Sequence, residues 1–513
     1  MSNFNDISEK VQKHSVCRKY VNEKEKNMVQ SIVEAVACHA KQNPDKLCAA
    51  DGRYELTYRM FWEHICGYAK HLKELGVEKG DCVVVRNAQN VVQLVTGLAI
   101  QLVGGIYVPV EKNVADQRIL EIVDTVQAKY YIAAKVTEVP CGFERITEVM
   151  KCRDENASYD DFDFPKNEDV AEILFTTGTT GKSKGIELIH RNVVAVSENV
   201  IDGVEMKKDN VEMIPVPLSH SHGLRRYYAN MLNGSAVVIM ANVVMTQVLF
   251  DCIEKYHVTS MDLVPAALAS IFNVSEDKLG EYKAQLDYVQ LGSAPIPDVD
   301  KERLRRLLPN TRLYNFYGTT ESGCSCIIDF NKYPEKKNCI GRPTCNAHFV
   351  FIGEEGTPIE ATKENPGLLA CSGEMNMVGY YKDAETTNSI MKNGYIQTED
   401  LSYVDEDGMI CLLGRQGDVI ISGGNKIAPS EIEDVAGKYE GVLECACVPV
   451  DSPILGKEPK LFVVMKEGVP FDQDSIYQYL RESLETYKVP KIIVEIDKLP
   501  RSFNGKILRR ELV

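Results

Sequence analysis

The chain has 513 residues, which is too long for one ordinary hydrophobic core and predicts two or more domains. Its formal net charge is -16, from 58 Lys and Arg against 74 Asp and Glu, which argues against non-specific binding to nucleic acid or to an anionic membrane surface. An anionic substrate would therefore need a locally basic pocket.

The 16 cysteines are scattered without the spacing of a metal site. Two pairs, at 324–326 and 445–447, are separated by one residue, so on a strand both members simply face one side. Residues 1–26 contain no apolar signal core, and the apolar run at 91–110 is interrupted by glycine and proline, which predicts a helix, a turn and a strand in place of a membrane span. We therefore expect free thiols, a cytoplasmic location and no membrane-spanning segment.

The N-terminal part of the chain alternates helical and strand-like segments. Two helical stretches flank a hairpin with Asp51-Gly52 at its turn, and strands and helices then follow each other in turn. Such alternation implies right-handed crossovers and a parallel sheet. The predicted helices are 31–40, 58–75, 89–102 and 119–125, the predicted strands are 82–86, 106–110 and 130–134, and the hairpin is 47–58.

A strongly polar loop follows at residues 176–185. It reads Thr-Thr-Gly-Thr-Thr-Gly-Lys-Ser-Lys-Gly between apolar strands at 173–175 and 186–188. Glycines bring backbone N–H groups close to a ligand, and the hydroxyls and two lysines add donors, so the composition favours a polyphosphate. The loop is not a P-loop, because position 176, where that motif has its first glycine, is threonine. The alternative is a flexible polar hairpin.

Two later strands are predicted to end in turns that contain candidate substrate residues. The strand at 211–217 leads into Leu-Ser-His-Ser-His-Gly, with His220 and His222, and then into a helix that opens with Leu-Arg-Arg-Tyr-Tyr. The strand at 288–291 ends in Gly-Ser-Ala-Pro, at the carboxyl end where α/β sheets bind ligands. The alternative for the histidines is an ordinary core or surface position. A helix at 192–201 and strands at 237–240 and 260–264 are also predicted.

The strand predicted at 313–316 enters Tyr-Gly-Thr-Thr-Glu at 317–321. Tyr317 could stack on a planar base, Thr320 could donate to a phosphate, and Glu321 could hold a Mg²⁺ ion that bridges phosphate oxygens. After this motif the chain becomes β-rich, which predicts a small β-barrel or an antiparallel sheet. The β-like segments are 349–351, 367–369, 395–398 and 410–413.

The sequence Gly-Arg-Gln-Gly-Asp at 414–418 interrupts this pattern and predicts a domain boundary. Beyond it, a helix that begins at Pro429, a helix at 474–484 and strands at 444–450, 461–466 and 492–496 form an α+β unit of about 100 residues. Near the end of the chain, an Asn-Gly turn at 504–505 presents Lys506, although a solvated basic tail is the alternative. We therefore predict an α/β fold with a large domain at 1–414, built from two βαβ-type sheets plus a small β-barrel, and a small α+β domain at 415–513.

Five motifs, in this order, resemble the adenylate-forming superfamily, which includes acyl- and aryl-CoA synthetases, adenylation domains of peptide synthetases and luciferases. The resemblance extends over nearly the whole chain from about residue 30. Ser183 stands where the family usually has proline, and Glu399 stands where it usually has glycine. The matching segments are 177–185, 317–321, 398–400, 414–433 and 499–512.

The resemblance implies a role for each matched residue. Lys506 would bridge the carboxylate and the α-phosphate during adenylation, Thr320 would bind the α-phosphate, and Glu321 would hold Mg²⁺. The phosphates of ATP would be contacted by Thr177, Thr179, Thr180 and Lys184, the adenine and its surroundings by Gly292, Ser293, Ala294, Tyr317, Gly318 and Thr319, the ribose by Asp400 and Arg415, and the acid and the pantetheine arm by His220, His222, Gly223, Arg226 and Gly424.

The implied reaction joins a carboxylic acid to the thiol of CoA. ATP would convert the acid to an acyl-adenylate with release of pyrophosphate, while a lysine and Mg²⁺ neutralise the developing charge. In this family the C-terminal domain is mobile and swings between the two half-reactions about a hinge, which Gly417 matches here. The alternatives are an acyl-adenylate ligase that loads the phosphopantetheine arm of a separate acyl carrier protein, and a non-catalytic adenylate-binding protein.

The sequence features that bear on the identity of the acid substrate are weaker than those that indicate the reaction. No aspartate follows the segment 217–223, where adenylation domains of peptide synthetases use one to hold the substrate amine, which argues against an amino acid. Arg225 or Arg226, if it faces the acyl tail, would favour a polar or anionic distal group, or a small aromatic acid, over a long alkyl chain. The alternative is that both arginines pack outward as surface cations.

Overall fold

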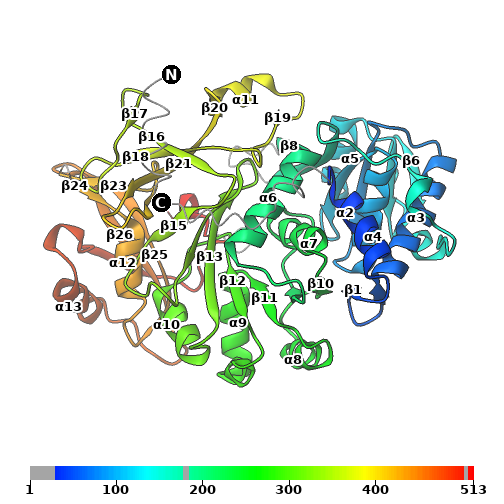
Figure 1. Ribbon diagram of the computed structural model, residues 1–513. Helices are drawn as coiled ribbons and strands as arrows, with labels where there is room; N and C mark the ends of the chain where they lie inside the picture. Colours follow the sequence, from blue (N-terminus) through cyan, green and yellow to red (C-terminus); the bar gives the residue numbers. More distant parts are fainter. Residues whose placement is uncertain (1–28, 177–183, 424, 502–506, 513) are drawn as a thin grey trace.

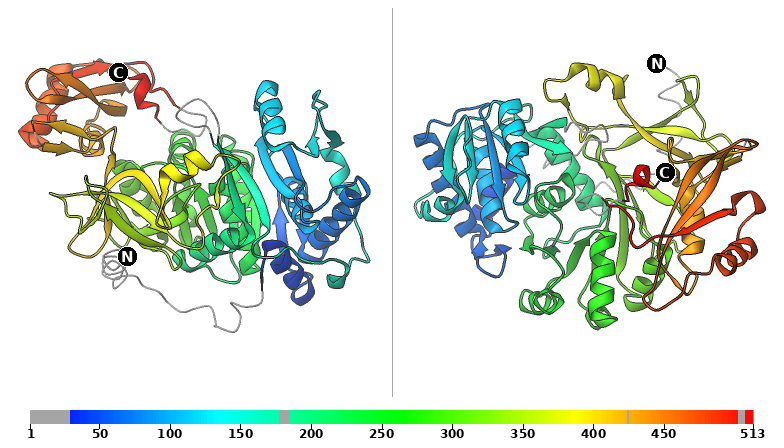
Figure 2. Two further views of the ribbon diagram at one scale, coloured as in Figure 1. Left: turned by 90° about the horizontal axis from the view of Figure 1, so that it is seen from above. Right: turned by 180° about the vertical axis from the view of Figure 1, so that it is seen from behind.

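The computed structural model describes residues 29–176, 184–423, 425–501 and 507–512. Within these ranges the strands form three sheets, of 15, seven and five strands. The seven-stranded and five-stranded sheets lie at opposite ends of the molecule, with the largest sheet between them (Figure 1 and Figure 2). The predicted α/β class, with a large N-terminal part and a small C-terminal part, is confirmed.

The seven-stranded sheet is mainly parallel, as the alternation of strands and helices predicts. β3 pairs in parallel with β4 and β5, whereas β7 and β8, on either side of the polar loop, are antiparallel. A strand from much later in the chain, β19, pairs with the outer edge of β8, which the sequence pattern did not indicate. The strands are β3 (Cys82–Asn87), β4 (Ile106–Glu111), β5 (Tyr130–Ala133), β6 (Gly142–Arg145), β7 (Val170–Thr176), β8 (Lys184–Ile189) and β19 (Gly379–Tyr380).

The largest sheet has a parallel half. Its strands run in the order β13, β12, β11, β9, β10 and β1, and the antiparallel strand β2 closes this edge as the second strand of the predicted hairpin. Parallel strands place their carboxyl ends along one edge, where α/β sheets bind ligands. These strands are β1 (Leu47–Ala50), β2 (Glu55–Thr57), β9 (Val211–Ile214), β10 (Ala236–Ile239), β11 (Ser260–Leu263), β12 (Tyr288–Leu291) and β13 (Arg312–Thr319).

The other half of the largest sheet is antiparallel. It begins where β14 pairs with β13 and continues through β15, β22, β21, β18, β16 and β17. The strand pairs of the described chain form an open run and do not close a barrel, so they support the antiparallel-sheet form of the prediction. The strands are β14 (Gly323–Asp329), β15 (Cys339–Pro343), β16 (His348–Ile352), β17 (Pro358–Ile359), β18 (Gly367–Ser372), β20 (Met391–Lys392), β21 (Tyr395–Val404) and β22 (Ile410–Arg415).

Helices fill the space between the seven-stranded and the largest sheet. The main core cluster joins Val83 of β3 and Leu98 of α4 with Tyr227 of α7 and Val237 of β10. Side-chain caps fix where helices begin: Asn90, for example, accepts a hydrogen bond from the backbone N–H of Gln93 at the start of α4. The helices of the large N-terminal part are α2 (Ile32–Gln42), α3 (Tyr58–Glu74), α4 (Val91–Leu102), α5 (Asp116–Val126), α6 (His190–Gly203), α7 (Ser221–Asn233), α8 (Thr246–Lys255), α9 (Pro265–Ser275), α10 (Asp298–Leu307) and α11 (Ala384–Ile390).

The C-terminal part has its own sheet and its own core. Its strand order is β24-β23-β26-β25, with β27 paired to β26, and Ile420, Ile432 and Leu461 belong to one buried cluster within it. None of the described helices is both long and apolar enough to cross a membrane. The elements are β23 (Ile420–Ser422), β24 (Asn425–Ile427), α12 (Pro429–Ala436), β25 (Val442–Ser452), β26 (Gly456–Met465), α13 (Gln473–Ser483) and β27 (Ile492–Glu495).

One part of the cysteine prediction is wrong. Thirteen cysteines of the described chain are free, but Cys339 of β15 and Cys411 of β22 form a disulfide. The two residues are direct partners in the antiparallel register, with 3.9 Å between their Cα atoms. Because 72 positions separate them along the chain, only strand pairing brings them together.

Two carboxylates oppose each other where the C-terminal part contacts α10. The pKa of Asp434 in α12 is raised to about 7, first by burial and then by the Asp298 carboxylate, while Lys301 and Lys337 oppose the rise. Lys438, also from the C-terminal part, lies 4.0 Å from Asp298. An acid whose folded pKa is raised contributes stability that is lost as the pH rises from its unfolded pKa through its folded pKa.

We therefore expect Asp434→Asn to be more stable than the parent protein at pH 8, by about 1–3 kcal/mol, and close to it at pH 4. Chemical unfolding at the two pH values measures this difference. Asp474→Asn, at an exposed position near the start of α13, is the matched control for the loss of a carboxylate from the same part of the molecule. An Asp434→Asn difference that is independent of pH would contradict the prediction.

Candidate functional site

The two turns that the sequence singled out after β9 and β12 meet in the structure. His222, in the first turn of α7, places Nδ1 2.7 Å from the Ser293 hydroxyl and Nε2 2.8 Å from the Asp262 carboxylate. Asp262 is fully buried on β11 and therefore fixes the orientation of the ring. A Cβ on Gly292 would lie 3.2 Å from His222 Cε1, so the small residue lets the turn approach the histidine.

The remaining residues of the histidine turn are also held by the fold. His220 Nε2 lies 2.5 Å from Oε1 of Glu111, which ends β4 of the neighbouring sheet. A Cβ on Gly223 would lie only 2.5 Å from the backbone oxygen of Pro217, so packing alone requires glycine at this position. The turn therefore connects the carboxyl ends of β4 and β9, which belong to different sheets.

The motif at 317–321 lies directly beside this turn. The Thr320 hydroxyl is 3.2 Å from the hydroxyl of Ser221, the first residue of α7. Thr319 accepts a hydrogen bond from the backbone N–H of Ser322, and a Cβ on Gly318 would lie 1.9 Å from the backbone oxygen of Gly323. The backbone is thus held in a tight turn that presents the Thr320 hydroxyl to the same edge as His222.

Tyr317 and Asp400 approach each other from two different strands. The Tyr317 hydroxyl donates to Asp400 Oδ2 over 2.5 Å, and burial together with this carboxylate raises the pKa of the phenol. Asp400 and Arg415 are register partners of β21 and β22. The Arg415 guanidinium is half-exposed and lies 3.5 Å from Glu399, the residue that replaces the expected glycine. The structure therefore brings together the two residues predicted to hold a ribose.

Tyr380 contacts two of the predicted site residues, but none of the sequence motifs included it. Its hydroxyl donates to Oε1 of Glu321 over 2.8 Å, and Lys184 Nζ lies over its ring, 5.0 Å from the centroid. The contact depends on β19, which pairs with β8 two residues beyond Lys184. Nothing around Tyr380 in the sequence marks it as functional, because the pairing spans nearly 200 residues.

Neither position predicted for the arginines of α7, facing the acyl tail or facing solvent, is found in the structure. Arg225 is 2% exposed and lies 2.7 Å from Glu172, and Arg226 is fully buried and hydrogen-bonds Glu212 over 2.7 Å. The surface-cation alternative is therefore wrong. The assignment of Arg226 to the acid is also corrected, because a core carboxylate already matches its charge and Tyr288 accepts a further hydrogen bond from it.

Several predicted residues lie outside the described part of the chain: Thr177, Thr179, Thr180, Gly424 and Lys506. Most of the described ones are linked by contacts near the carboxyl ends of β12 and β13, and they supply hydroxyls, a half-buried tyrosine and a carboxylate. Glu321 Oε2 has no hydrogen-bond partner among the described residues, and the side chain is partly exposed. Such a set suits a phosphate ester together with a hard divalent cation.

The sequence matches two family models. The model described as AMP-binding enzyme matches residues 36–381, and the model described as AMP-binding enzyme C-terminal domain matches residues 431–506. The chain is 28% identical to feruloyl-CoA synthase of Amycolatopsis sp over 489 residues, which cover 92% of this chain and 96% of that protein. It is 30% identical to 4-coumarate–CoA ligase 3 of Arabidopsis thaliana over 357 residues, which cover 67% of this chain and 63% of that protein.

A similar fold occurs in solved structures. One is o-succinylbenzoate coenzyme A synthetase of Bacillus subtilis in complex with ATP and magnesium ion, with a TM-score of 0.81 and 23% sequence identity. The superposition covers 93% of this chain and 99% of that chain. The similarity therefore extends over both the large and the small part of the molecule.

Proposed function

The chain belongs to the AMP-binding enzyme family, and we propose that it is an ATP-dependent acid–CoA ligase. In the first step a carboxylate oxygen of the acid attacks the α-phosphorus of ATP, and pyrophosphate leaves. In the second step the thiol of CoA attacks the carbonyl carbon of the acyl-adenylate, AMP leaves, and the thiol proton is lost. The relatives named as CoA ligases support both steps.

One observation carries this proposal: the residues expected to hold nucleotide, phosphate and cation meet at one sheet edge although they come from distant segments. Tyr317 and Asp400 would hold the adenosine, with Arg415 beside the ribose hydroxyls. Thr320 would donate to the α-phosphate, and its position relative to α7 is fixed by Ser221. Positioning of this kind supplies a large part of the rate enhancement in phosphoryl-transfer chemistry.

The residues also fit a magnesium ion. Glu321 uses one carboxylate oxygen to accept from Tyr380 and has the other available, which is the arrangement expected of a ligand oriented by a neighbour. Bound there, Mg²⁺ would neutralise phosphate charge. Lys184 adds a cation on the other side of Tyr380, next to the loop expected to contact the phosphates.

We further propose that residues 1–414 and 415–513 are separate domains that move relative to each other between the two steps. The separate sheet and core of the C-terminal part support this boundary. Gly417 lies between β22 and β23, is exposed, and has open space around the position of a Cβ, which suits a hinge. The 13 cysteines of the described chain that form no disulfide support a cytoplasmic location.

For the acid, we propose a small aromatic or polar carboxylic acid. The names of two relatives support this class, since they act as feruloyl-CoA synthase and 4-coumarate–CoA ligase. The arginines of α7 no longer support it, because both are neutralised in the core. Efficient turnover of long-chain fatty acids, with no use of aryl or short dicarboxylic acids, would contradict the proposal.

Pyrophosphate release across a panel of carboxylic acids, measured with and without CoA, tests the proposed reaction. We expect acid-dependent release of pyrophosphate, and formation of an acyl-CoA thioester when free CoA is added. Release without any thioester would indicate a different acceptor, such as an acyl carrier protein. The absence of ATP–pyrophosphate exchange with every acid would indicate a non-catalytic adenylate-binding protein.

Two substitutions of Tyr380 can separate its expected effect on metal binding from its expected effect on ATP binding. We expect Tyr380→Phe, which loses only the hydroxyl, to raise the Mg²⁺ concentration for half-maximal exchange roughly tenfold, because Glu321 loses its orienting donor. Tyr380→Leu should in addition raise the KM for ATP, because Lys184 then loses the ring. Tyr381→Phe, at the adjacent position, is the control. Unchanged Mg²⁺ dependence in Tyr380→Phe would contradict the role assigned to this hydroxyl.

A further inference from the structure

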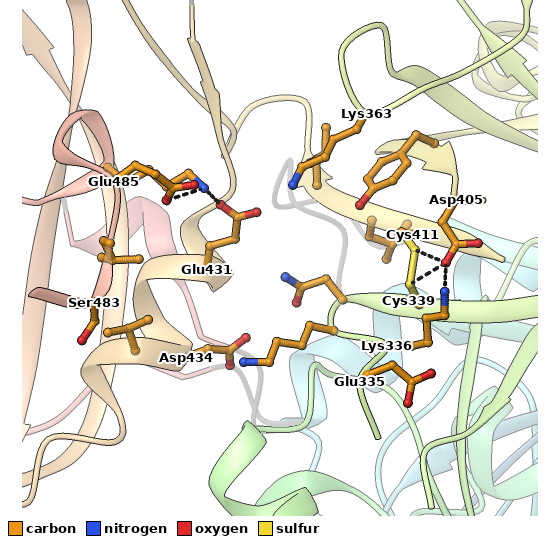
Figure 3. Close-up of a pocket in the computed structure, with 18 of the residues that line it drawn as sticks. Glu335, Lys336, Cys339, Lys363, Asp405, Cys411, Glu431, Asp434, Ser483 and Glu485 are labelled. Atoms are coloured by element: carbon orange, nitrogen blue, oxygen red, sulfur yellow. Dashed lines mark hydrogen bonds and ion pairs between the residues drawn. A yellow bond between two sulfur atoms is a disulfide. The ribbon is translucent and has the colours of Figure 1, made fainter. Parts of the chain in front are cut away.

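The Cys339–Cys411 disulfide lies on the wall of a large cavity that is separate from the site described above. The cavity has a volume of about 630 Å³ and opens between the antiparallel half of the largest sheet and the C-terminal part. Figure 3 shows the two cysteines and Lys336 on one wall, and Glu431 and Asp434 of α12 on the opposite wall. A volume of this size accommodates a small organic molecule.

The two cysteines differ in exposure. Cys339 is 8% exposed and Cys411 is 1% exposed, although both line the cavity. A thiolate attacks the disulfide sulfur that it can reach, and the other sulfur then leaves. The structure therefore favours Cys339 as the attacked sulfur and Cys411 as the leaving group.

Charges around the disulfide are paired and of both signs. Asp405 Oδ2 lies 4.0 Å from each sulfur and 2.8 Å from the Lys336 ammonium. Farther along the walls, Lys363 points into the cavity and Glu335 lies near the cysteines (Figure 3). Walls that offer both cations and anions complement a ligand with both an amino group and carboxylates.

From these observations we propose that Cys339 and Cys411 form a site of reversible thiol–disulfide exchange, and that its reaction partner is a small zwitterionic thiol that binds in the cavity. The partner thiolate attacks Sγ of Cys339, the bond to Cys411 breaks, and Cys411 leaves as a thiolate that takes up a proton. A second small thiolate then attacks the sulfur of the first, the bond to Sγ of Cys339 breaks, and Cys339 leaves as a thiolate that takes up a proton. One protein disulfide and two small thiols thus become two protein thiols and one small disulfide.

The exchange site also lies close to the connection between the two parts of the molecule. Cys411 precedes Arg415, the last residue of β22, by four positions, and the disulfide ties β22 to β15. A small thiol joined to Cys339 would occupy space between β15 and α12. The modified form would therefore restrict movement of the C-terminal part, a consequence that depends on the proposed domain motion, whereas the exchange itself does not.

Differential alkylation of the full-length protein tests the exchange without any activity measurement. Protein purified without reductant is incubated with reduced glutathione or with the uncharged dithiol dithiothreitol, then alkylated, digested and analysed by mass spectrometry. We expect Cys339 and Cys411 to be protected before treatment and to become labelled together after either reagent. Buried Cys326, which should label only on unfolding, is the internal control. Labelling of the pair before treatment, or protection that survives both reagents, would overturn the proposal.

Single substitutions test the order of attack and the role of the cavity. In Cys411→Ser, oxidised glutathione should modify Cys339 at least roughly tenfold faster than it modifies Cys411 in Cys339→Ser, because Cys411 is the more deeply buried residue. Lys363→Glu should slow the reaction of the intact disulfide with glutathione several-fold and leave the reaction with dithiothreitol unchanged. Equal rates at the two cysteines would overturn the assignment of the attacked sulfur, and equal slowing with both reagents would overturn binding of a charged thiol in the cavity. Unchanged thermal unfolding verifies that each variant is folded.

Discussion

Replacing Arg226 by methionine is expected to lower the free energy of unfolding by about 3–5 kcal/mol. Arg226 and Glu212 have no exposed surface, and the guanidinium Nε lies 2.7 Å from a Glu212 carboxylate oxygen. Without the guanidinium, the carboxylate remains in the core, and among the described residues only Asn230 and Tyr288 are left as side-chain donors to it. An unpaired buried charge is far more costly than the loss of one hydrogen bond. Urea unfolding measures the effect.

The loss should also depend on pH. Burial raises the pKa of Glu212, and Arg226 opposes that rise. Arg226→Met therefore removes the largest influence that lowers this pKa. The folded variant then retains the Glu212 proton at a pH where the unfolded chain has lost it, and each further rise in pH favours unfolding. The variant should therefore be closer to the parent protein at pH 5 than at pH 8. Adding Glu212→Gln should recover most of the lost stability and remove the pH dependence.

An exposed ion pair provides the matched control. Arg59 and Asp45 are 3.4 Å apart with side chains 55% and 88% exposed, so Arg59→Met should change the stability by less than about 0.5 kcal/mol. If Arg226→Met is no more destabilising than Arg59→Met, the ion pair does not have the buried position that the structure assigns to it.

Lys506→Ala is expected to reduce the rate of acyl-adenylate formation by roughly 10²–10³-fold. The reason is electrostatic: the attacking carboxylate and the triphosphate repel each other, and a lysine placed between them stabilises the charge that develops at the α-phosphorus. Thioester formation from a preformed acyl-adenylate should change little, because the proposed domain motion removes this lysine before the second step. Single-turnover measurements of each step, started from acid with ATP or from the acyl-adenylate, separate the two effects.

Lys491→Ala is the control for a general effect of charge removal in the same domain. Lys491 is 70% exposed and lies 3.8 Å from Glu458, so its loss should leave both steps unchanged. Equal losses in both steps for Lys506→Ala would contradict the assignment of Lys506 to adenylation alone, and with it the proposed exchange of lysine and pantetheine at the site.

The functional turns could be predicted from the sequence because each is contiguous. The turns at 218–223 and 292–295 and the motif at 317–321 each follow an apolar strand, and parallel strands place their carboxyl ends at one edge. The alternation of strands and helices likewise indicated the α/β class, and the break at 414–418 precedes the separate C-terminal sheet. The sequence by itself thus determined the class of the fold, the turns at which a nucleotide site is predicted and the kind of reaction that the family resemblance implies.

Three features were decided only by the tertiary structure. The direction of Arg226 depends on Glu212 of the strand beneath α7, the role of Tyr380 depends on the pairing of β19 with β8, and the disulfide depends on the register of β15 and β22. Periodicity and turn residues report on neighbours within a few positions, because they reflect the conformation of the local backbone. Which distant strand lies alongside, and in which register, is determined by how the sheets and helices pack as a whole, and each of these side chains acquires its partner only through that packing.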